Sequence, residues 1–353
     1  MAVPELLRRL LLAPGPSGYE TAAATVWREA ASAFATVTGD ALGSSVARVP
    51  GTAGGPLLVV VGHIDEIGLI VTHVDESGYV YFRGVGGWRG EVLRGQRVEL
   101  LSRSGPVQGV VAKKGPVRKR KREDKETVTE LDDLHIDIGA SDREGALRLV
   151  RPGDTAVVAA EPLELPNARL ASRALDNRLG AYVALEAVRL VAQAGGAPGD
   201  IAAVAAVQEE VGDFGGARTS VFALEPQVAL AVDVTDATDV PDGDPKVAGE
   251  AKVGGGPVLG RGSTINPKIF ELLVEVADAE GISYSLNVSG GDTHTDLDAI
   301  HVSRAGVPGG LVSIPTRYIH TPTELVSLDD VDAAARLVAA FAHRLEPGLD
   351  LTR

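Results

Sequence analysis

The amino-acid sequence predicts an α/β fold, in which a mainly parallel sheet carries helices on both faces and contains an inserted small β-barrel. Continuous apolar runs at residues 57–61 and 201–207 are typical of strands buried on both faces of a sheet. Helical patterns alternate with such runs after residue 171, which indicates parallel strands joined by helices. Between residues 67 and 163, short alternating runs separated by glycines indicate a barrel.

The beginning of the chain is expected to form two helices followed by one buried strand. The first segment has arginines within its apolar stretch and no small-residue cleavage site, so we expect an amphipathic helix and not a signal peptide. The sequence APGPSG at residues 13–18 breaks this helix, and residues 19–34 have the spacing of a second one. The strand at residues 57–61 then leads into Gly-His-Ile-Asp-Glu at residues 62–66.

The barrel is expected at residues 67–163, so that residues 1–66 and 164–353 form the main α/β domain. Its strands are expected at residues 69–74, 79–83, 96–101, 109–112 and 155–159. The basic run KKGPVRKRKREDK, residues 113–125, lies inside this region. It could bind nucleic acid or another anionic surface, but a solvated loop between strands is the simpler interpretation.

The rest of the main domain is expected to alternate between helices and strands. Helices are predicted at residues 178–194, 267–280, 296–305 and 328–345, and strands at residues 201–207, 228–232 and 311–314. A chain of 353 residues is long enough for two domains of ordinary size, in agreement with this division.

Composition excludes several classes of protein. The apolar runs are far shorter than the roughly 18–20 residues of a membrane span, so we expect no membrane helix. Because the first segment does not have the pattern of a signal peptide, we expect a cytoplasmic location. A net charge of −14 argues against a general nucleic-acid-binding protein. The absence of cysteine removes disulfides and thiolate chemistry. Any metal site must therefore use nitrogen and oxygen ligands.

Polar residues gather where the predicted buried strands end, which is where open α/β sheets bind their ligands. Two histidines and five carboxylates lie at these ends or just before the first helix of the α/β region: His63, Asp65, Asp176, Glu209, Glu210, Asp233 and His320. Taken singly, each has a simple structural explanation, such as a helix cap, a turn residue or a core histidine. Together they would crowd negative charges at one sheet edge without a counter-ion.

A pair of divalent cations would resolve this crowding. His63 and His320 can each supply one imidazole, Asp233 and Glu210 one carboxylate each, and Asp176 a bridging carboxylate. Such a ligand set leaves positions open for a shared water, as a catalytic site requires. The sequence therefore predicts a catalytic site with two metal ions.

Two further carboxylates are predicted to act beside these ligands. Asp65 follows His63 by two residues, so in an extended segment both project to the same face, and Asp65 can hold the second imidazole nitrogen. Glu209 and Glu210 are neighbours and would point in different directions. If Glu210 binds metal, Glu209 can face the bound water as a general base.

The same segments resemble the tetrahedral aminopeptidase family, which includes glutamyl, leucyl and lysyl aminopeptidases and some members labelled endoglucanases. The resemblance extends over nearly the whole chain. It rests on the ordered motifs GHIDEIGLIV (62–71), RALDNRLGAYVALEA (173–187), VQEEVGDFGGAR (207–218), AVDVTDATDVP (231–241), TDLDAIHVSRAGVP (295–308) and SIPTRYIHTPTELVSLDD (313–330).

The resemblance implies a zinc-peptidase-like fold and a role for each matching residue. His63, Asp233 and Asp176 would bind one metal, and Glu210, His320 and the same Asp176 the other. It also implies two divalent ions per subunit, zinc or cobalt, with manganese as an alternative. The barrel insertion would serve in dimerisation and access, and the dimers would assemble into a hollow dodecamer.

Some segments depart from the family pattern. His294 and Asp298 lie where many relatives have smaller or neutral residues, and an acidic segment containing Asp242 and Asp244 follows Asp239. His294 could touch the substrate or a metal, but a histidine in a surface turn is the simpler interpretation. The run at residues 118–122 is also longer than is typical, which leaves the role of its loop open.

These observations predict a metal-dependent aminopeptidase that acts on short peptides. One alternative is an endoglucanase-type glycoside hydrolase, whose paired carboxylates would need neither His63 nor His320. The 14 aromatic residues, 6 Phe, 6 Tyr and 2 Trp, are also few for stacking sugars along a cleft. Another alternative is a non-enzymatic binding or assembly protein that uses the basic loop. It would leave the residues at the strand ends unexplained.

Overall fold

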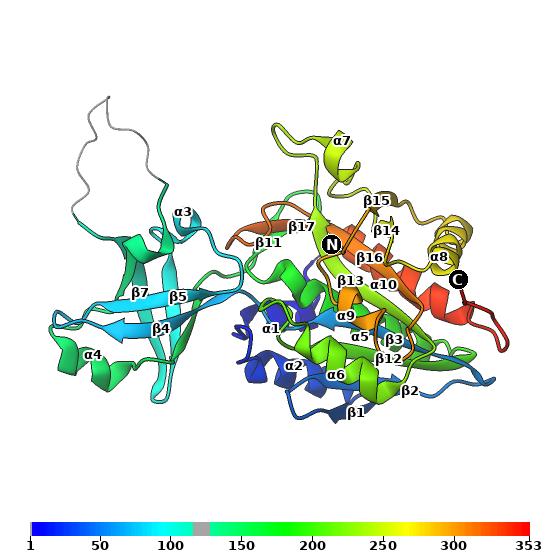
Figure 1. The fold of residues 1–353 in the computed structure, drawn as a ribbon, viewed down its shortest axis with the longest axis horizontal. Helices are drawn as coiled ribbons and strands as arrows, with labels where there is room; N and C mark the ends of the chain where they lie inside the picture. Colours follow the sequence, from blue (N-terminus) through cyan, green and yellow to red (C-terminus); the bar gives the residue numbers. More distant parts are fainter. Residues whose placement is uncertain (1, 116–127) are drawn as a thin grey trace. The chain divides into compact units, whose positions relative to one another are not determined.

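The computed structural model describes residues 2–115 and 128–353, which divide into two compact units (Figure 1). The first unit contains Met1–Glu66, Pro162–Ile319 and Thr323–Arg353, and the second contains Ile67–Glu161 and His320–Pro322. Most of the predicted basic run, including residues 118–122, lies outside the described residues.

An eight-stranded mixed sheet forms the centre of the first unit, in the order β1-β2-β12-β3-β13-β16-β14-β15. The strands β12, β3, β13 and β16 run parallel, whereas β2 joins β12, and β14 joins β16, in antiparallel pairs. The bounds are β1 Thr36–Gly39, β2 Ser45–Val49, β3 Gly55–His63, β12 Gly199–Ala206, β13 Val228–Asp236, β14 Val258–Gly262, β15 Ser285–Ser289 and β16 Gly309–Thr316.

Helices cover both faces of this sheet, because its central strands are apolar on both sides. Every residue of β3 from Leu57 to His63 is buried. The helices are α1 Glu5–Leu12, α2 Thr21–Ala31, α5 Leu175–Gln193, α6 Gly215–Leu224, α7 Pro245–Ala248, α8 Pro267–Ala279, α9 Leu297–Ile300 and α10 Leu328–His343. The α/β class predicted from the sequence is therefore correct. No helix in the described ranges is long and apolar enough to cross a membrane.

The N-terminal helices belong to the same core as the sheet. Leu7, Leu10 and Leu11 of α1 are buried at the spacing of one helix face. Trp27 of α2 is fully buried, and its indole N–H donates to the carbonyl oxygen of Ala181 in α5 over 2.9 Å. A smaller sheet, β10 Leu163–Leu165, β11 Arg169–Ser172 and β17 Glu324–Ser327, lies beside this core.

The second unit is a closed barrel with its own hydrophobic core. Its strands follow one another in the order β4-β5-β8-β7-β6-β9. The bounds are β4 Gly68–Val74, β5 Val80–Val85, α3 Gly90–Leu93, β6 Arg97–Ser102, β7 Gly105–Lys113, the 3-10 helix Leu131–Asp133, β8 Leu134–Asp137, α4 Arg143–Leu149 and β9 Thr155–Val158. Inward-facing side chains such as Val98, Leu100 and Ile136 fill the interior. The predicted inserted barrel is confirmed.

One predicted helix is wrong. The sequence predicts a helix over residues 296–305, but α9 ends at Ile300. Arg304 and Gly306 have positive φ angles of 54° and 99°, which no right-handed helix contains, and Pro308 follows closely. The four outer strands β1, β2, β14 and β15 are further differences, because their short and partly polar sequences do not have the apolar runs of the sheet centre.

Candidate active site

The carboxyl ends of the parallel strands meet at one edge of the large sheet. The register of β3 and β12 pairs their last residues, His63 and Ala206. A short connection separates β12 from Glu209 and Glu210, and Asp233 lies in the second half of β13. Parallel pairing therefore brings residues from distant parts of the sequence to the same edge.

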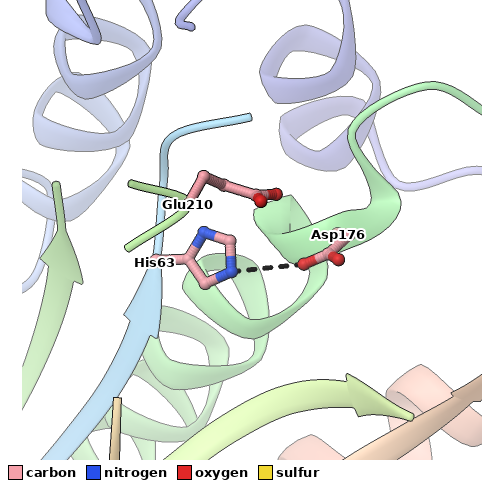
Figure 2. A group of neighbouring side chains, drawn as sticks. All are labelled: His63, Asp176 and Glu210. Atoms are coloured by element: carbon pink, nitrogen blue, oxygen red, sulfur yellow. Dashed lines mark ion pairs between the residues drawn. The ribbon is translucent and has the colours of Figure 1, made fainter. Parts of the chain in front are cut away.

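The imidazole of His63 lies among several of these carboxylates. Its Nε2 is 3.2 Å from an oxygen of Asp176, 3.7 Å from one of Glu209 and 3.8 Å from one of Asp233. Figure 2 shows the ring of His63 with Asp176 on one side and Glu210 on another. Four segments of chain, β3, the start of α5, the loop after β12 and β13, thus contribute to one cluster.

Asp65 links the imidazole to the loop that carries the two glutamates. One of its carboxylate oxygens lies 3.4 Å from Nδ1 of His63. The two oxygens also accept hydrogen bonds from the backbone N–H groups of Glu209 and Glu210, each over 3.1 Å. Asp65 is fully buried, so one carboxylate fixes both the ring and the following loop. The contact with the ring follows the sequence spacing, whereas the contact with the loop depends on tertiary structure.

Close packing of α5 on the sheet positions Asp176. A side chain at Gly62 would collide with the backbone of Gly180, so only glycine lets α5 lie this near to β3. Asn177 donates from its side chain to the carbonyl oxygen of Val232 over 2.8 Å and accepts from the N–H of Gly180 over 2.8 Å. These contacts tie the first turn of α5 to β13, beside Asp233.

Left-handed backbone occurs close before two of the predicted site residues and at a third. Ala174 (φ 57°) comes shortly before Asp176, Gln208 (φ 61°) immediately before Glu209, and His320 itself has φ 60°. Non-glycine residues adopt this conformation at an energetic cost, and such positions concentrate at functional sites.

A buried network of opposite charges supports the segment that carries Asp176. The carboxylate of Glu66 pairs with the guanidinium groups of Arg173 and Arg178, which lie on either side of Asp176 in sequence. Arg178, which is 0% exposed, also donates to the carbonyl oxygens of Leu10 and Ala13. The end of β3, the start of α5 and the segment after α1 are thereby joined in one network.

A positive charge would stabilise the carboxylates of this cluster in their ionised form. Burial and the neighbouring carboxylates raise the pKa of Asp233 well above its usual range, and burial also raises the pKa of Glu209. Burial disfavours the charged form of His63, but Glu209, Asp176 and Asp65 together raise its pKa well above the usual value. Asp65 instead has a lowered pKa, because its hydrogen bonds outweigh its burial.

The donor atoms fit divalent cations. Ligand atoms of His63, Asp176 and Glu210 lie within 4.8 Å of one another, and so do those of His63, Glu209 and Asp233. One imidazole among buried carboxylates is a nitrogen and oxygen donor set suited to first-row divalent metals. Bound cations would also offset the repulsion that raises the carboxylate pKa values.

Among the described residues, neither His320 nor His294 belongs to the two groups of ligand atoms around His63. His320 belongs to the second unit, where a side chain at Gly87 would come within 2.8 Å of its Nδ1, and its role as a ligand stays a prediction. His294 is exposed in a turn with φ 56°, and its backbone N–H donates to Asp298 over 2.7 Å.

Two buried carboxylates, Glu324 and Asp296, also interact with the cluster and were not predicted from the sequence. Glu324 in β17 accepts a hydrogen bond from the backbone N–H of Asp176 over 3.0 Å. Asp296 precedes α9, and its charge raises the pKa values of Glu209 and Asp233. Both residues lie within the motifs of the family resemblance. Asp296 stands at the start of a predicted helix, where a carboxylate normally acts as a cap, so its position gives no sign of another role.

Residues 43–337 match the M42 glutamyl aminopeptidase family. The chain belongs to this family. The protein is therefore a peptide hydrolase of the aminopeptidase type.

Individual relatives share both its length and its fold. The lysyl aminopeptidase of Pyrococcus furiosus is 35% identical over 99% of each chain. The TET aminopeptidase of the marine sediment archaeon Thaumarchaeota archaeon SCGC AB-539-E09 has a TM-score of 0.91, with 37% identity over 97% of this chain and 96% of that chain. The TET1 peptidase of Pyrococcus horikoshii, which can assemble into a tetrahedron or a large octahedral shell, has a TM-score of 0.85, with 29% identity over 97% of this chain and 99% of that chain.

Proposed function

We propose that this protein is a metal-dependent aminopeptidase that removes the N-terminal residue of short peptides. The observation that carries the proposal is the buried group of donor atoms around His63, in a chain of the M42 family. Burial and the neighbouring carboxylates disfavour the anionic forms of Glu209 and Asp233, and bound cations would offset this effect.

Two divalent ions per subunit, zinc or cobalt with manganese as an alternative, are the proposed cofactors. His63 and Asp233 are assigned to one ion, Glu210 and His320 to the other, and Asp176 to both. When bound, such ions polarise the carbonyl of the first peptide bond and acidify a shared water. The support for this assignment is the donor set and its burial.

Glu209 is the proposed general base. It lies 3.7 Å from Nε2 of His63, and the bond from its N–H to Asp65 fixes its backbone. Its carboxylate accepts a proton from the attacking water and then donates it to the nitrogen of the leaving peptide. Burial raises its pKa, which favours holding that proton between the two steps.

The excess of buried carboxylates also suits a substrate with a free α-amine. A peptide N-terminus is protonated near neutral pH, so it is drawn to a negatively charged site. An internal peptide segment has no such charge. This difference would restrict cleavage to the first residue.

The proposed assembly is a homo-oligomer in which the barrel at residues 67–163 serves dimerisation and access, and dimers combine into a dodecamer. The related TET1 peptidase forms a tetrahedron or an octahedral shell, which supports this proposal. We also propose a cytoplasmic location, and we expect neither a membrane nor a nucleic acid as a partner. A closed shell would admit short peptides and exclude folded proteins.

An activity panel tests the function. Purified protein is assayed on aminoacyl chromogenic substrates and on carboxymethyl-cellulose, with chelator and then with added zinc, cobalt or manganese. We expect aminoacyl hydrolysis that the chelator abolishes and the metals restore. Full activity in protein shown to be metal-free by elemental analysis would disprove metal dependence. Hydrolysis of cellulose alone would favour the endoglucanase alternative.

A further inference from the structure

Asp296 is a buried carboxylate that the proposed chemistry does not use. The residue is 2% exposed, and none of the described residues donates a hydrogen bond to either of its side-chain oxygens. A buried carboxylate without donors loses the solvation it has in water and gains nothing in return. Such a group in a native fold requires an explanation.

The position of Asp296 in the chain makes this absence more informative. The residue directly precedes α9, where an aspartate side chain ordinarily accepts a hydrogen bond from the first turn of the helix. Asp296 makes no such bond. The nearby Asp298, in contrast, accepts hydrogen bonds from the backbone N–H groups of Thr293 and His294. The segment therefore satisfies its local donors with Asp298 and leaves Asp296 available.

Asp296 interacts electrostatically with the cluster around His63. Its negative charge raises the pKa values of Glu209 and Asp233, and the charges of His63 and Asp65 act on Asp296 in turn. Burial raises its own pKa to about 7. A cation placed against its oxygens would supply both the missing hydrogen bonds and the missing positive charge.

A metal ion is a poor match for this group. Asp296 does not belong to either set of described side chains whose ligand atoms lie within 4.8 Å of one another. The substrate offers a better match, because its α-ammonium carries three N–H donors and one positive charge. The ammonium is attached to the carbon next to the scissile carbonyl, so its partner must lie close to the general base. Asp296 meets this condition, because its charge acts on Glu209, the proposed general base.

We propose that Asp296 binds the protonated α-amine of the N-terminal residue of the substrate, and so selects free N-termini. This inference rests on the proposed aminopeptidase function. It deepens that function by naming the residue that tells a free N-terminus from an internal peptide bond.

The test compares two ligands that differ only in the amine. Leucine hydroxamate and 4-methylpentanohydroxamate have the same side chain and the same metal-binding group, but the second lacks the α-amine. Their dissociation constants are measured by calorimetry on metal-loaded wild type, Asp296→Asn and Asp292→Asn, together with the metal content of each protein. Asp292 is exposed in the same loop, so the Asp292→Asn control removes the same charge without touching the buried group.

We expect wild type and Asp292→Asn to bind the amine-bearing hydroxamate about 10- to 100-fold more tightly than its partner, the usual worth of a charged hydrogen bond. In Asp296→Asn this preference should fall to less than about threefold. Affinity for 4-methylpentanohydroxamate and the metal content should stay as in wild type.

Three other results would overturn the proposal. A preference that persists in Asp296→Asn shows that another group binds the amine, with the aminopeptidase function intact. Loss of metal from Asp296→Asn, and also from the smaller Asp296→Ser, shows that Asp296 maintains the metal site. If wild type binds neither hydroxamate and cleaves no aminoacyl substrate, the proposed function itself fails.

Discussion

Glu209 and Glu210 have the same side chain, yet the structure gives them different surroundings. Glu210 shares a group of ligand atoms with His63 and Asp176, whereas Glu209 shares one with His63 and Asp233. Both backbones are held by Asp65. Proximity alone would allow either residue to bind a metal, so substitution is needed to separate the roles.

The first prediction concerns these two glutamates. Glu209→Gln keeps the shape of the side chain but removes the base, so turnover should fall about 10²- to 10⁴-fold with both metals retained. Glu210→Gln replaces a charged ligand by a neutral one, and excess metal should partly rescue its activity. Turnover and metal content are measured against metal concentration for both variants. If Glu209→Gln loses metal and Glu210→Gln does not, the two roles are reversed.

The second prediction concerns Glu20, a buried residue whose carboxylate accepts hydrogen bonds from the N–H groups of Gly18 and Gln208. Burial raises its pKa from 4.5 to about 7 in the folded protein. At a pH between these two pKa values, the unfolded chain binds fewer protons at this residue than the folded protein does. The contribution of Glu20 to the free energy of unfolding therefore falls as pH rises from about 4.5 to 7.

Glu20→Gln removes this dependence and keeps an oxygen that can accept both hydrogen bonds. The free energy of unfolding of the variant, relative to wild type, should rise by about 1–3 kcal/mol between pH 4.5 and 8. Denaturant titrations in the presence of a chelator measure this difference without the contribution of bound metal. A difference that stays constant across this pH range would contradict the raised pKa.

At the scale of elements, the ends of β3, α1 and α5 meet at Glu66. Its carboxylate pairs with Arg173 and Arg178, and the backbone N–H of Gly15 also donates to it over 3.0 Å. Removing one partner from a buried ion pair leaves the other charge unpaired. Here the loss of one carboxylate would remove the ion-pair partner that two buried guanidinium groups share.

The third prediction is that Glu66→Gln lowers the free energy of unfolding by about 3–5 kcal/mol, the usual cost of breaking a buried ion pair. Asp332→Asn provides a matched control, because it breaks the exposed pair with Arg336 within α10 and should cost less than about 1 kcal/mol. Urea unfolding of both variants and wild type measures the two costs. Equal stability of the two variants would show that the buried network contributes no more than a surface pair.

At the scale of the whole molecule, the closed barrel is a separate unit with a hydrophobic core of its own. The fourth prediction is that the protein assembles through this unit, to as many as twelve chains of 36.5 kDa. Multi-angle light scattering at micromolar concentration should report an oligomer. A monomer would contradict the proposed assembly, and cleavage of intact folded proteins would contradict confinement within a shell.

The sequence by itself determined the fold class and most of the candidate site residues. Apolar runs such as residues 57–61 predict the central strands because burial on both faces leaves no place for polar side chains. Polar residues at the ends of such strands must then meet, because parallel pairing aligns those ends. His63, Glu209, Glu210 and Asp233 follow this rule. The outer strands β1, β2, β14 and β15 do not, because they are short and lack long apolar runs, and α9 does not, because turn geometry ends it at Ile300.

Only the tertiary structure decided which charges are paired. Asp65 can be assigned to His63 from spacing, but its bonds to the loop after β12 depend on how two distant segments pack. The sequence likewise does not reveal the partners of Glu66, or that no residue in the described part of the chain donates to the side chain of Asp296. The residue type of a carboxylate does not tell whether it caps a helix, pairs with arginine or binds a ligand. Its role depends on burial and on neighbours that are distant in the chain, because these set the cost of its charge.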